Sequence, residues 1–310
     1  MKKIIVTTTI YPPSQATLKF CQMEEWDIII VGDLSTPHAL YKKLAKKYKN
    51  VTYLDSDIQK KKHSKISKLI GWKSIQRRNI GFIEAYRMGA DIVATVDDDN
   101  IPYKNWGENL LVAKEIELDC YEPSALVFDP LSITKNNFIW HRGYPIQLLD
   151  QRLNVKSIGK IKRKVLIQAD LWDGNPDIDA IARIVYKNPV ASYKDVKKPY
   201  CSNKISPFNS QNTFLHRSVL PYYAVLPHIG RMDDIWGSYI VQHYFPNSLI
   251  YNKASTYQDR NTQDPVVNLE KELFGYKETN NLLDDLQNFI DFLPKQTRTF
   301  WLEYRKQYDQ

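Results

Sequence analysis

The sequence predicts an α/β fold in which a mainly parallel, mixed sheet is flanked by helices. Three observations lead to this prediction. Apolar runs in the first hundred residues are short and rich in β-branched side chains, turn-forming residues bound them, and helical patterns separate them. Strand–helix–strand repetition of this kind is typical of parallel sheets, which bind ligands beyond the carboxyl ends of their strands. The predicted strands cover residues 3–10, 26–32, 51–54 and 91–96.

Two helices are predicted between these strands. The first covers residues 35–50, with Ser35 or Thr36 as its N-cap. The second covers residues 74–90 and ends at Gly89, a residue type that commonly follows the last helical turn. Both helices connect neighbouring strands, as the parallel arrangement requires.

The remainder of the chain divides into two parts with different sequence patterns. Residues 121–265 contain more Pro, Tyr and Trp, and we expect them to form a mixed α+β half that closes the site. Residues 266–310 are expected to form a helical tail that packs on the body, because apolar side chains recur there at helical spacing. These side chains are Leu282, Leu286, Phe289, Ile290 and Leu293.

Composition places the protein among globular chains. Of its 310 residues, 43% are hydrophobic, and no run approaches the roughly 18 apolar residues of a membrane span. The start, "MKKIIVTTTIYPP", is a poor signal peptide, so we expect a cytoplasmic protein. Three cysteines without CxxC spacing indicate ordinary thiols rather than a disulfide framework.

The net charge of +8 comes partly from lysines crowded into residues 41–50 and 59–65. Such runs usually form a solvated helix face or a loop. The alternatives are attraction of an anionic substrate or peripheral contact with a membrane surface. We expect no nucleic-acid partner, because the sequence has no zinc finger or single-strand-binding signature.

Three consecutive aspartates follow the strand predicted at residues 91–96, in the stretch "DIVATVDDDN". In an extended segment Asp97 and Asp99 point to one side and Asp98 points away. Two carboxylates facing one point favour Mn²⁺ or Mg²⁺, completed by diphosphate oxygens. The alternative is a solvated acidic turn, or a helix cap at Asp97. An upstream strand ending in "VGD" at Asp33 adds to the pattern, which is that of a GT-A-type nucleotide-sugar transferase fold.

Four further motifs, in order, resemble the reversibly glycosylated polypeptides, the plant UDP-arabinopyranose mutases. They are "RGYPI" (142–146), "LWDGNPDIDA" (171–180), "IGRMDDIWGSY" (229–239) and "DPVVNLEKE" (264–272). The first hundred residues, with "TTTIYPP" and "VGDLSTP", are more similar to STELLO-like GT-A proteins. The resemblance implies a nucleotide-sugar-binding half at residues 1–120, a sugar and acceptor half at 121–265, and the tail at 266–310.

The resemblance also implies roles for individual residues. Asp97 and Asp99 would hold the metal on a UDP-sugar diphosphate, and Asp259 would replace a histidine that the family has near its last motif. Arg142 matches the arginine that the family reversibly glycosylates, although a plain diphosphate clamp is an equal alternative. Asp233 and Asp234 would bind sugar hydroxyls or act as a base, or else cap a helix.

A wider set of residues is expected to contact the substrate. It combines the ends of the predicted strands, the helix that precedes the aspartates, and the family motifs. Arginines on a helix surface are more often merely solvated, so Arg78 has that alternative. The set is Thr9, Asp33, Arg78, Asp98, Trp172, Asp177, Asp179, Asn212 and Trp236.

The sequence thus predicts a metal-dependent enzyme that binds a UDP-sugar, such as UDP-arabinose, and breaks its anomeric bond. The first expectation is a mutase interconverting pyranose and furanose forms, with self-glycosylation at Arg142. The alternative is a glycosyltransferase that passes the sugar to a separate acceptor. A third expectation, from another class, is a non-catalytic UDP-sugar-binding subunit that assembles into a homo- or hetero-oligomer.

Overall fold

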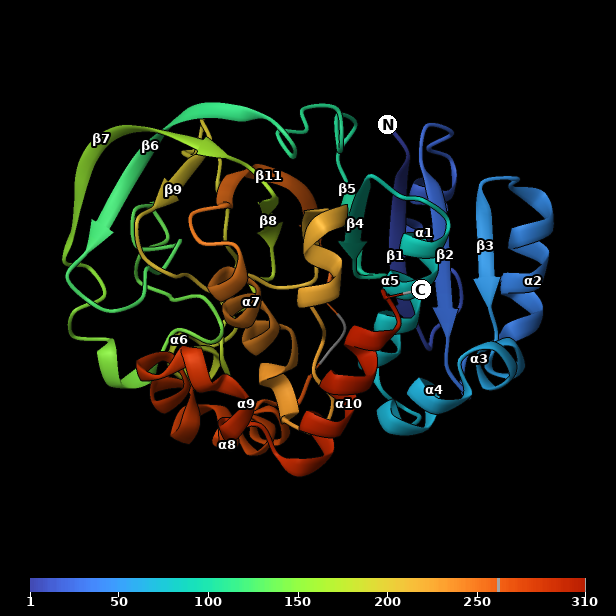
Figure 1. The fold of residues 1–310 in the computed structure, drawn as a ribbon. Helices are drawn as coiled ribbons and strands as arrows, with labels where there is room; N and C mark the ends of the chain where they lie inside the picture. The colour runs from blue at the N-terminus through green and yellow to red at the C-terminus, as the bar shows by residue number, and fades with distance from the viewer. Residues whose placement is uncertain (261–262, 310) are drawn as a thin grey trace.

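The first hundred residues fold as the predicted strand–helix repeats (Figure 1). The computed structural model describes residues 1–260 and 263–309. Each apolar run becomes a buried strand because its β-branched side chains pack on both faces of the sheet. The elements are β1 (Lys3–Thr9), α1 (Gln15–Cys21), β2 (Asp27–Gly32), α2 (His38–Lys47), β3 (Val51–Leu54), α3 (Ser56–Lys62), α4 (Ser64–Ile70), η1 (Ile75–Arg77), α5 (Arg78–Arg87) and β4 (Ile92–Val96).

The boundaries of the two predicted helices differ in detail. Helix α2 begins at His38, after Pro37, and neither Ser35 nor Thr36 caps it. The Thr36 hydroxyl instead accepts a hydrogen bond from the Asp33 backbone N–H at 2.7 Å, which shapes the turn after β2. The second predicted helix is split into η1 and α5, and Gly89 follows it with φ +79°, the left-handed conformation expected after a helix end.

The second half of the chain alternates less regularly, as expected, because long loops separate its strands. Its antiparallel pairs need no helical crossover, so strands and loops dominate. The elements are β5 (Asn100–Pro102), β6 (Glu115–Pro123), η2 (Ile146–Leu148), β7 (Val155–Lys164), β8 (Ile167–Gly174), α6 (Ala180–Tyr186), β9 (Tyr200–Ser202), β10 (Asn212–His216), η3 (Arg217–Tyr222), η4 (Gly230–Met232), α7 (Asp233–Tyr244) and β11 (Leu249–Gln258).

All these strands join one sheet in the order β3-β2-β1-β4-β10-β8-β11-β9-β6-β7, with β5 paired to β11. The strands β3, β2, β1 and β4 are parallel, and β10 runs antiparallel to both of its neighbours. The predicted α/β class with a helix-covered mixed sheet is confirmed, and the parallel pairing that the sequence indicated is concentrated at the N-terminal end. Strand order reverses at β1, which opens a crevice at the carboxyl ends of β1 and β4.

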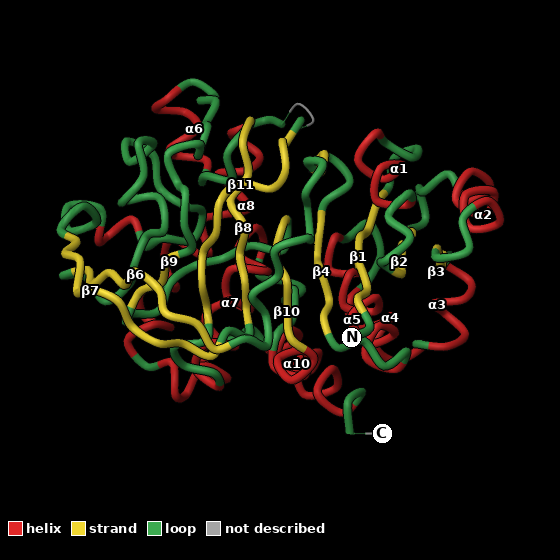
Figure 2. The backbone as a smooth tube through the Cα atoms, turned by 90° about the horizontal axis from the view of Figure 1, so that it is seen from above, coloured by secondary structure: helices red, strands yellow, loops and turns green. Residues whose placement is uncertain are grey.

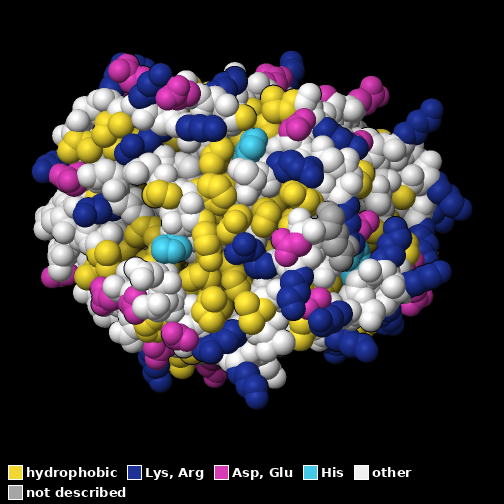
Figure 3. Space-filling view, in the orientation of Figure 1, with side chains coloured by type: hydrophobic (Ala, Val, Ile, Leu, Met, Phe, Trp, Pro, Cys, Tyr) yellow, Lys and Arg dark blue, Asp and Glu magenta, His cyan; other side chains and the backbone are white. Residues whose placement is uncertain are grey.

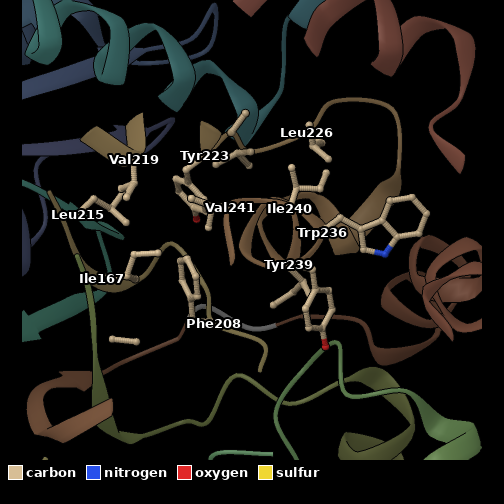
Figure 4. Packing of buried hydrophobic residues seen from close by; sticks show 14 of the residues in the cluster. Ile167, Phe208, Leu215, Val219, Tyr223, Leu226, Trp236, Tyr239, Ile240 and Val241 are labelled. Atoms are coloured by element: carbon tan, nitrogen blue, oxygen red, sulfur yellow. The ribbon is translucent and has the colours of Figure 1, made fainter. Parts of the chain in front are cut away.

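Helices cover both faces of this sheet (Figure 2). Side chains of α1 and α2 pack on one face, against Ile28, Ile30 and Phe214. Side chains of α4 and α5 pack on the other face, in the large core that also contains α7. The close-up in Figure 4 shows Trp236, Tyr239 and other α7 residues in the interior of this core.

The tail is helical and packs on the body, but it is not one continuous helix. Its elements are α8 (Pro265–Asp284), η5 (Leu286–Asn288), α9 (Phe289–Phe292) and α10 (Lys295–Lys306). The predicted apolar stripe spans three of them, because the chain leaves helical geometry at Asp285 (φ −136°). The Tyr304 hydroxyl of α10 donates to the backbone carbonyls of Leu220 and Tyr223, at 3.2 and 2.9 Å, which ties the tail to η3.

The lysine-rich segments lie at the surface on α2, α3 and α4. Figure 3 shows Lys and Arg side chains gathered along the edge of the molecule where α2 lies in Figure 1. Among residues 1–260 and 263–309, we find no helix that combines the length and the apolar character needed to cross a bilayer.

Candidate active site

A cavity of about 550 Å³ opens where the carboxyl ends of β1, β4 and β11 meet the start of β10. Its position is the one that the reversal of strand order predicts for a ligand site. Side chains far apart in the sequence converge there, and charged and amide side chains make up most of the lining. Seven predicted site residues line it: Asp97, Asp98, Asp99, Arg142, Asp177, Asp233 and Asp234.

A second cavity, of about 350 Å³, adjoins the first. Its walls include Ile10, Tyr11 and Ile75, and the predicted residues Thr9 and Asp33 also line it. Both Asp33 carboxylate oxygens accept backbone hydrogen bonds, from Leu34 and from Ser74 at 2.9 Å. The two cavities share the wall formed by Thr8, Tyr11, Lys73, Ser74, Ile75 and Asp98.

The acidic triplet is a turn rather than an extended segment, because β4 ends at Val96 and Asp98 and Asp99 form a turn before β5. The expectation that Asp98 points away is therefore wrong. Asp98 lines both cavities, and its carboxylate accepts a hydrogen bond from the Thr9 hydroxyl. The Ser14 hydroxyl donates to the Asp98 carbonyl, so α1 helps to hold the turn.

Arg78 holds Asp97 from behind. Its side chain is fully buried, and it donates to the Asp97 carboxylate and to the backbone and side-chain oxygens of Ser210 at 2.6 and 2.7 Å. The expectation that Arg78 contacts the substrate, and the alternative that it is solvated, are therefore both wrong, because Arg78 is buried and lines neither cavity. It is a positioning residue that bonds to one carboxylate oxygen of Asp97, and Asp97 itself lines the cavity.

Asp99 has the features of a metal ligand. Its Oδ1 atom is buried and, within the described chain, has no hydrogen-bond partner. Burial and the neighbouring Asp97 charge raise the pKa of Asp99 to about 7. A divalent cation would relieve both the burial cost and the repulsion, so the residues present fit such a group.

The side chains supply only part of a coordination shell. Across residues 1–260 and 263–309, no group of three or more His, Cys, Asp or Glu is arranged to hold a metal ion. Asp259 donates its backbone N–H to the Asp99 carbonyl at 3.0 Å, and it lines a neighbouring cavity of about 250 Å³ with Asp98 and Asp99. It does not line the main cavity, which differs from its expected role there. Asp259 belongs to the stretch "YQDRNTQDP" (257–265), and residues 261 and 262 of this stretch lie outside the described residues.

Arg142 sits at the centre of a buried network. Its Nε and Nη2 atoms donate to Asp177 at 2.9 to 3.1 Å, and Nη2 also lies 3.0 Å from Asp234. Its Nη1 atom donates to the Arg231 carbonyl. These carboxylates raise the pKa of Arg142 despite its burial, so the guanidinium stays charged. Asp177 also pairs with Arg260 at 3.4 Å.

Asp233 differs from Asp234, although both begin α7. Asp234 accepts bonds from the Ser210 N–H and hydroxyl, at 2.9 and 3.1 Å, besides its pairing with Arg142. Asp233 accepts one side-chain bond, from the Gln76 amide at 2.6 Å. Burial and the adjacent Asp234 charge raise the pKa of Asp233 to about 7. A carboxylate in this state can accept a proton near neutral pH.

Four residues expected to contact the substrate belong to the interior instead. Trp236 donates its indole N–H to the Thr279 hydroxyl at 3.0 Å, and Trp172 lies edge-on to His141. Asp179 caps α6 by accepting from the Ala182 N–H. Asn212 bonds to Trp106 and Ser255. None of these four residues lines the main cavity.

Several cavity residues were not predicted, and they are basic or amide side chains. Lys73 and Gln76 come from the segment before α5, and Arg260 follows the carboxyl end of β11. The position of Arg260, just after a buried strand at the ligand-binding edge, is a signal that could have found it. Arg231 and Lys271 come from η4 and α8, and only the fold brings them together.

Taken together, the fold and the site define an α/β protein with an acid-rich ligand cavity at the switch point of its sheet. No family model matches the chain. It is similar to two curated proteins of Arabidopsis thaliana, the probable glycosyltransferases STELLO1 (23% identical over 295 residues) and STELLO2 (21% over 298 residues). The matches cover 88% and 86% of this chain but only 37% and 38% of those proteins. They indicate distant homology to glycosyltransferase-like proteins.

Among solved structures, one that resembles the chain is glucosyl-3-phosphoglycerate synthase from Mycobacterium tuberculosis in complex with phosphoglyceric acid. The TM-score is 0.47 at 10% sequence identity, and the match covers 91% of this chain and 78% of that one.

Proposed function

We propose that the protein is a metal-dependent glycosyltransferase that passes a sugar from a nucleotide-sugar to the hydroxyl group of a separate acceptor. The observation that carries this proposal is the acidic turn at the wall shared by two cavities. Distant homology to probable glycosyltransferases supports the transferase over the mutase that the sequence motifs first indicated.

The arrangement suits a nucleoside diphosphate sugar such as a UDP-sugar. The 350 Å³ cavity offers apolar walls and Asp33 to a nucleoside. The shared wall offers Lys73 and the acidic turn to the diphosphate, and the larger cavity then receives the sugar. Asp98, which contacts both cavities, would stand where the nucleoside ends and the phosphates begin.

Asp99, with the free oxygen of Asp97, would hold Mn²⁺ or Mg²⁺. When bound, such an ion neutralises the charge that develops on the diphosphate leaving group. Arg78 fixes Asp97 in a single orientation, and Thr9 does the same for Asp98. The chain therefore holds its carboxylates in place before the substrate arrives.

Asp233 is the residue we assign as general base. The acceptor hydroxyl would attack the anomeric carbon while its proton passes to the Asp233 carboxylate. The bond between the anomeric carbon and the diphosphate oxygen breaks in the same step, and the nucleoside diphosphate leaves with both bonding electrons. Gln76 orients the carboxylate through its hydrogen bond to Oδ2.

Arg142 has a different part in this proposal from the one that the family resemblance implies. Guanidinium is a poor nucleophile while it is protonated, and here two carboxylates keep the proton on it. We therefore assign Arg142 to positioning, since it holds Asp234 and Asp177 in the wall behind the sugar. Self-glycosylation would require the network to release it first.

A UDP-pyranose mutase is the second candidate, because Asp233 and Asp234 line the same cavity as the acidic triplet and a mutase needs no acceptor. One experiment separates the candidates: incubation with a panel of UDP-sugars and Mn²⁺, followed by product analysis and intact-mass measurement. The transferase should release UDP slowly to water, faster with an acceptor hydroxyl, and gain no mass. A furanose product formed without an acceptor would establish the mutase, and tight binding without turnover would establish a binding subunit.

A further inference from the structure

The wall of the large cavity formed by η4 and α8 carries two cationic side chains that the transfer step does not use. These are Arg231 and Lys271, and both line the cavity. The two elements approach closely, since a Cβ atom on Gly230 would lie only 2.0 Å from the Lys271 carbonyl oxygen. The side chains of Arg231 and Lys271 are therefore presented from adjoining pieces of backbone.

Arg231 is held in a fixed direction by buried groups. Its Nε atom donates to Glu272 at 2.8 Å, and the Glu272 side chain is fully buried. Glu272 is anchored in turn by the Ala180 N–H at 2.7 Å and the Tyr276 hydroxyl at 2.5 Å. The Arg231 carbonyl accepts from Arg142. Within the described chain, the two terminal nitrogens of Arg231 have no hydrogen-bond partner, so they remain available to a ligand.

Charge in this wall is not balanced. Arg142 and Arg260 balance Asp177 and Asp234, and Arg231 balances Glu272. Lys271 is exposed and has no ion-pair partner among the described residues. The buried Arg183 lies behind the same wall, and it bonds to the Asn175 side chain and the Pro176 carbonyl rather than to a carboxylate. The cavity as a whole is lined by six aspartates and five Lys or Arg side chains, so the positive charge is local to the wall of Arg231 and Lys271, and an anion is favoured at that wall.

The location argues against the donor diphosphate as that anion. The nucleoside cavity shares its wall with the large one at Lys73 to Ile75, and neither Arg231 nor Lys271 lines the nucleoside cavity. Gln76, next in the chain after that shared wall, bonds to Asp233, and Arg231 precedes Asp233 by two residues. Asp233 is therefore bonded to the segment that borders the nucleoside cavity and lies two residues from Arg231, and all three line the large cavity.

We propose that Arg231 and Lys271 form an acceptor subsite for an oxyanion, so that the acceptor carries a phosphate or similar acidic group near the hydroxyl that is glycosylated. This inference rests on the proposed transferase function and names the substrate class of its acceptor side. Arginine with one side fixed to a carboxylate can still bind an oxyanion through its free terminal nitrogens, and lysine adds a point charge.

The test uses inorganic phosphate as the probe, titrated calorimetrically into the whole protein saturated with UDP and Mg²⁺. Wild type should bind phosphate, and Arg231→Gln and Lys271→Gln should each weaken this binding at least tenfold while the affinity for UDP stays within twofold of wild type. Lys46→Gln, which removes an exposed charge on α2, is the matched control and should leave both affinities unchanged. Lys271→Gln keeps the test decisive if Arg231→Gln does not fold.

Two outcomes would overturn the inference. Equal losses of UDP and phosphate affinity in the variants would assign the pair to the donor diphosphate. Phosphate binding that is absent in wild type, or is unchanged in both variants, would show that this wall takes no oxyanion. If the wild type did not bind UDP in the presence of Mg²⁺, the proposed transferase function itself would be refuted. The UDP titration is therefore carried out first.

Discussion

Replacement of Arg142 by alanine tests the buried network most directly. The substitution removes three contacts to Asp177 and the pairing with Asp234, and it leaves both carboxylates in a protein interior. Breaking a buried ion pair by removing one partner costs about 3–5 kcal/mol. Asp177 keeps Arg260 and Asn209 as partners, which places the expected loss in the free energy of unfolding near the middle of that range, about 4 kcal/mol.

That loss converts to a melting temperature. With an unfolding entropy of about 2.1 cal/mol/K for each of 310 residues, a loss of about 4 kcal/mol lowers Tm by about 6 °C. Calorimetry and urea unfolding at pH 7 measure the two quantities. The matched control is Arg298→Ala, because Arg298 pairs with Asp291 at 3.7 Å on the surface, where such pairs contribute about 1 kcal/mol or less.

The stability lost in Arg142→Ala depends on pH, and the direction of this dependence follows from the pKa of Asp177. In wild type the Arg142 charge holds the pKa of Asp177 well below its usual range, so the stabilisation is present at neutral pH and is lost as the pH falls through that lowered pKa. In the alanine variant the freed carboxylates take up protons at higher pH. The stability difference should therefore be largest near pH 7 and shrink below about pH 4. A loss under about 1 kcal/mol at pH 7, equal to the surface control, would refute the assigned role.

The remaining predictions concern the acidic turn, the base and one glycine. Asp99→Asn should slow metal-dependent UDP release roughly 100-fold or more with little change in Tm, whereas Asp97→Asn should also lower Tm, because it strands the buried Arg78 charge. Equal Tm for the two variants would contradict the Arg78 pairing. Asp233→Asn should abolish transfer. In wild type, kcat/KM should rise as the pH increases through about 7, because the Asp233 carboxylate then loses its proton. A rise in kcat/KM near pH 4 instead would exclude Asp233 as the base. Gly230→Ala should destabilise the protein by about 1–3 kcal/mol in urea titrations, since φ is +69° and the added Cβ meets the Lys271 carbonyl; an unchanged midpoint would argue against that close packing.

The N-terminal strands, and the place of the three acids at the end of one of them, could be predicted because local pattern determines them. β-Branched runs between helices have few alternatives, and three acids at the end of such a run mark the ligand edge. The direction of Asp98 could not be predicted, because it depends on the turn formed at Asp98 and Asp99 and on a hydrogen bond from the Thr9 hydroxyl, 89 residues away in the sequence. Spacing alone treats that segment as extended.

The second half of the site depends on contacts between distant segments. Arg142 meets Asp177 and Asp234 across 35 and 92 residues, and no local pattern encodes this convergence. Motif resemblance marked these three residues, and all three line the cavity. It also marked Trp172 and Trp236, which are buried in the core. Large aromatic side chains suit both core packing and substrate contact, and the sequence offers no means of telling which of the two a given tryptophan serves.

The segment from Lys73 to Gln76 has a consequence for the order of events in a turnover. It is a short stretch of backbone whose Ser74 N–H is bonded to Asp33 in the nucleoside cavity and whose Gln76 amide is bonded to Asp233. Because these two attachments are two residues apart, Asp33 and Asp233 are linked through one short stretch of backbone. In the proposed transferase, a nucleoside bound beside Asp33 would act through this segment on the hydrogen bond that orients Asp233, and binding of the donor before the acceptor is the order that this linkage favours.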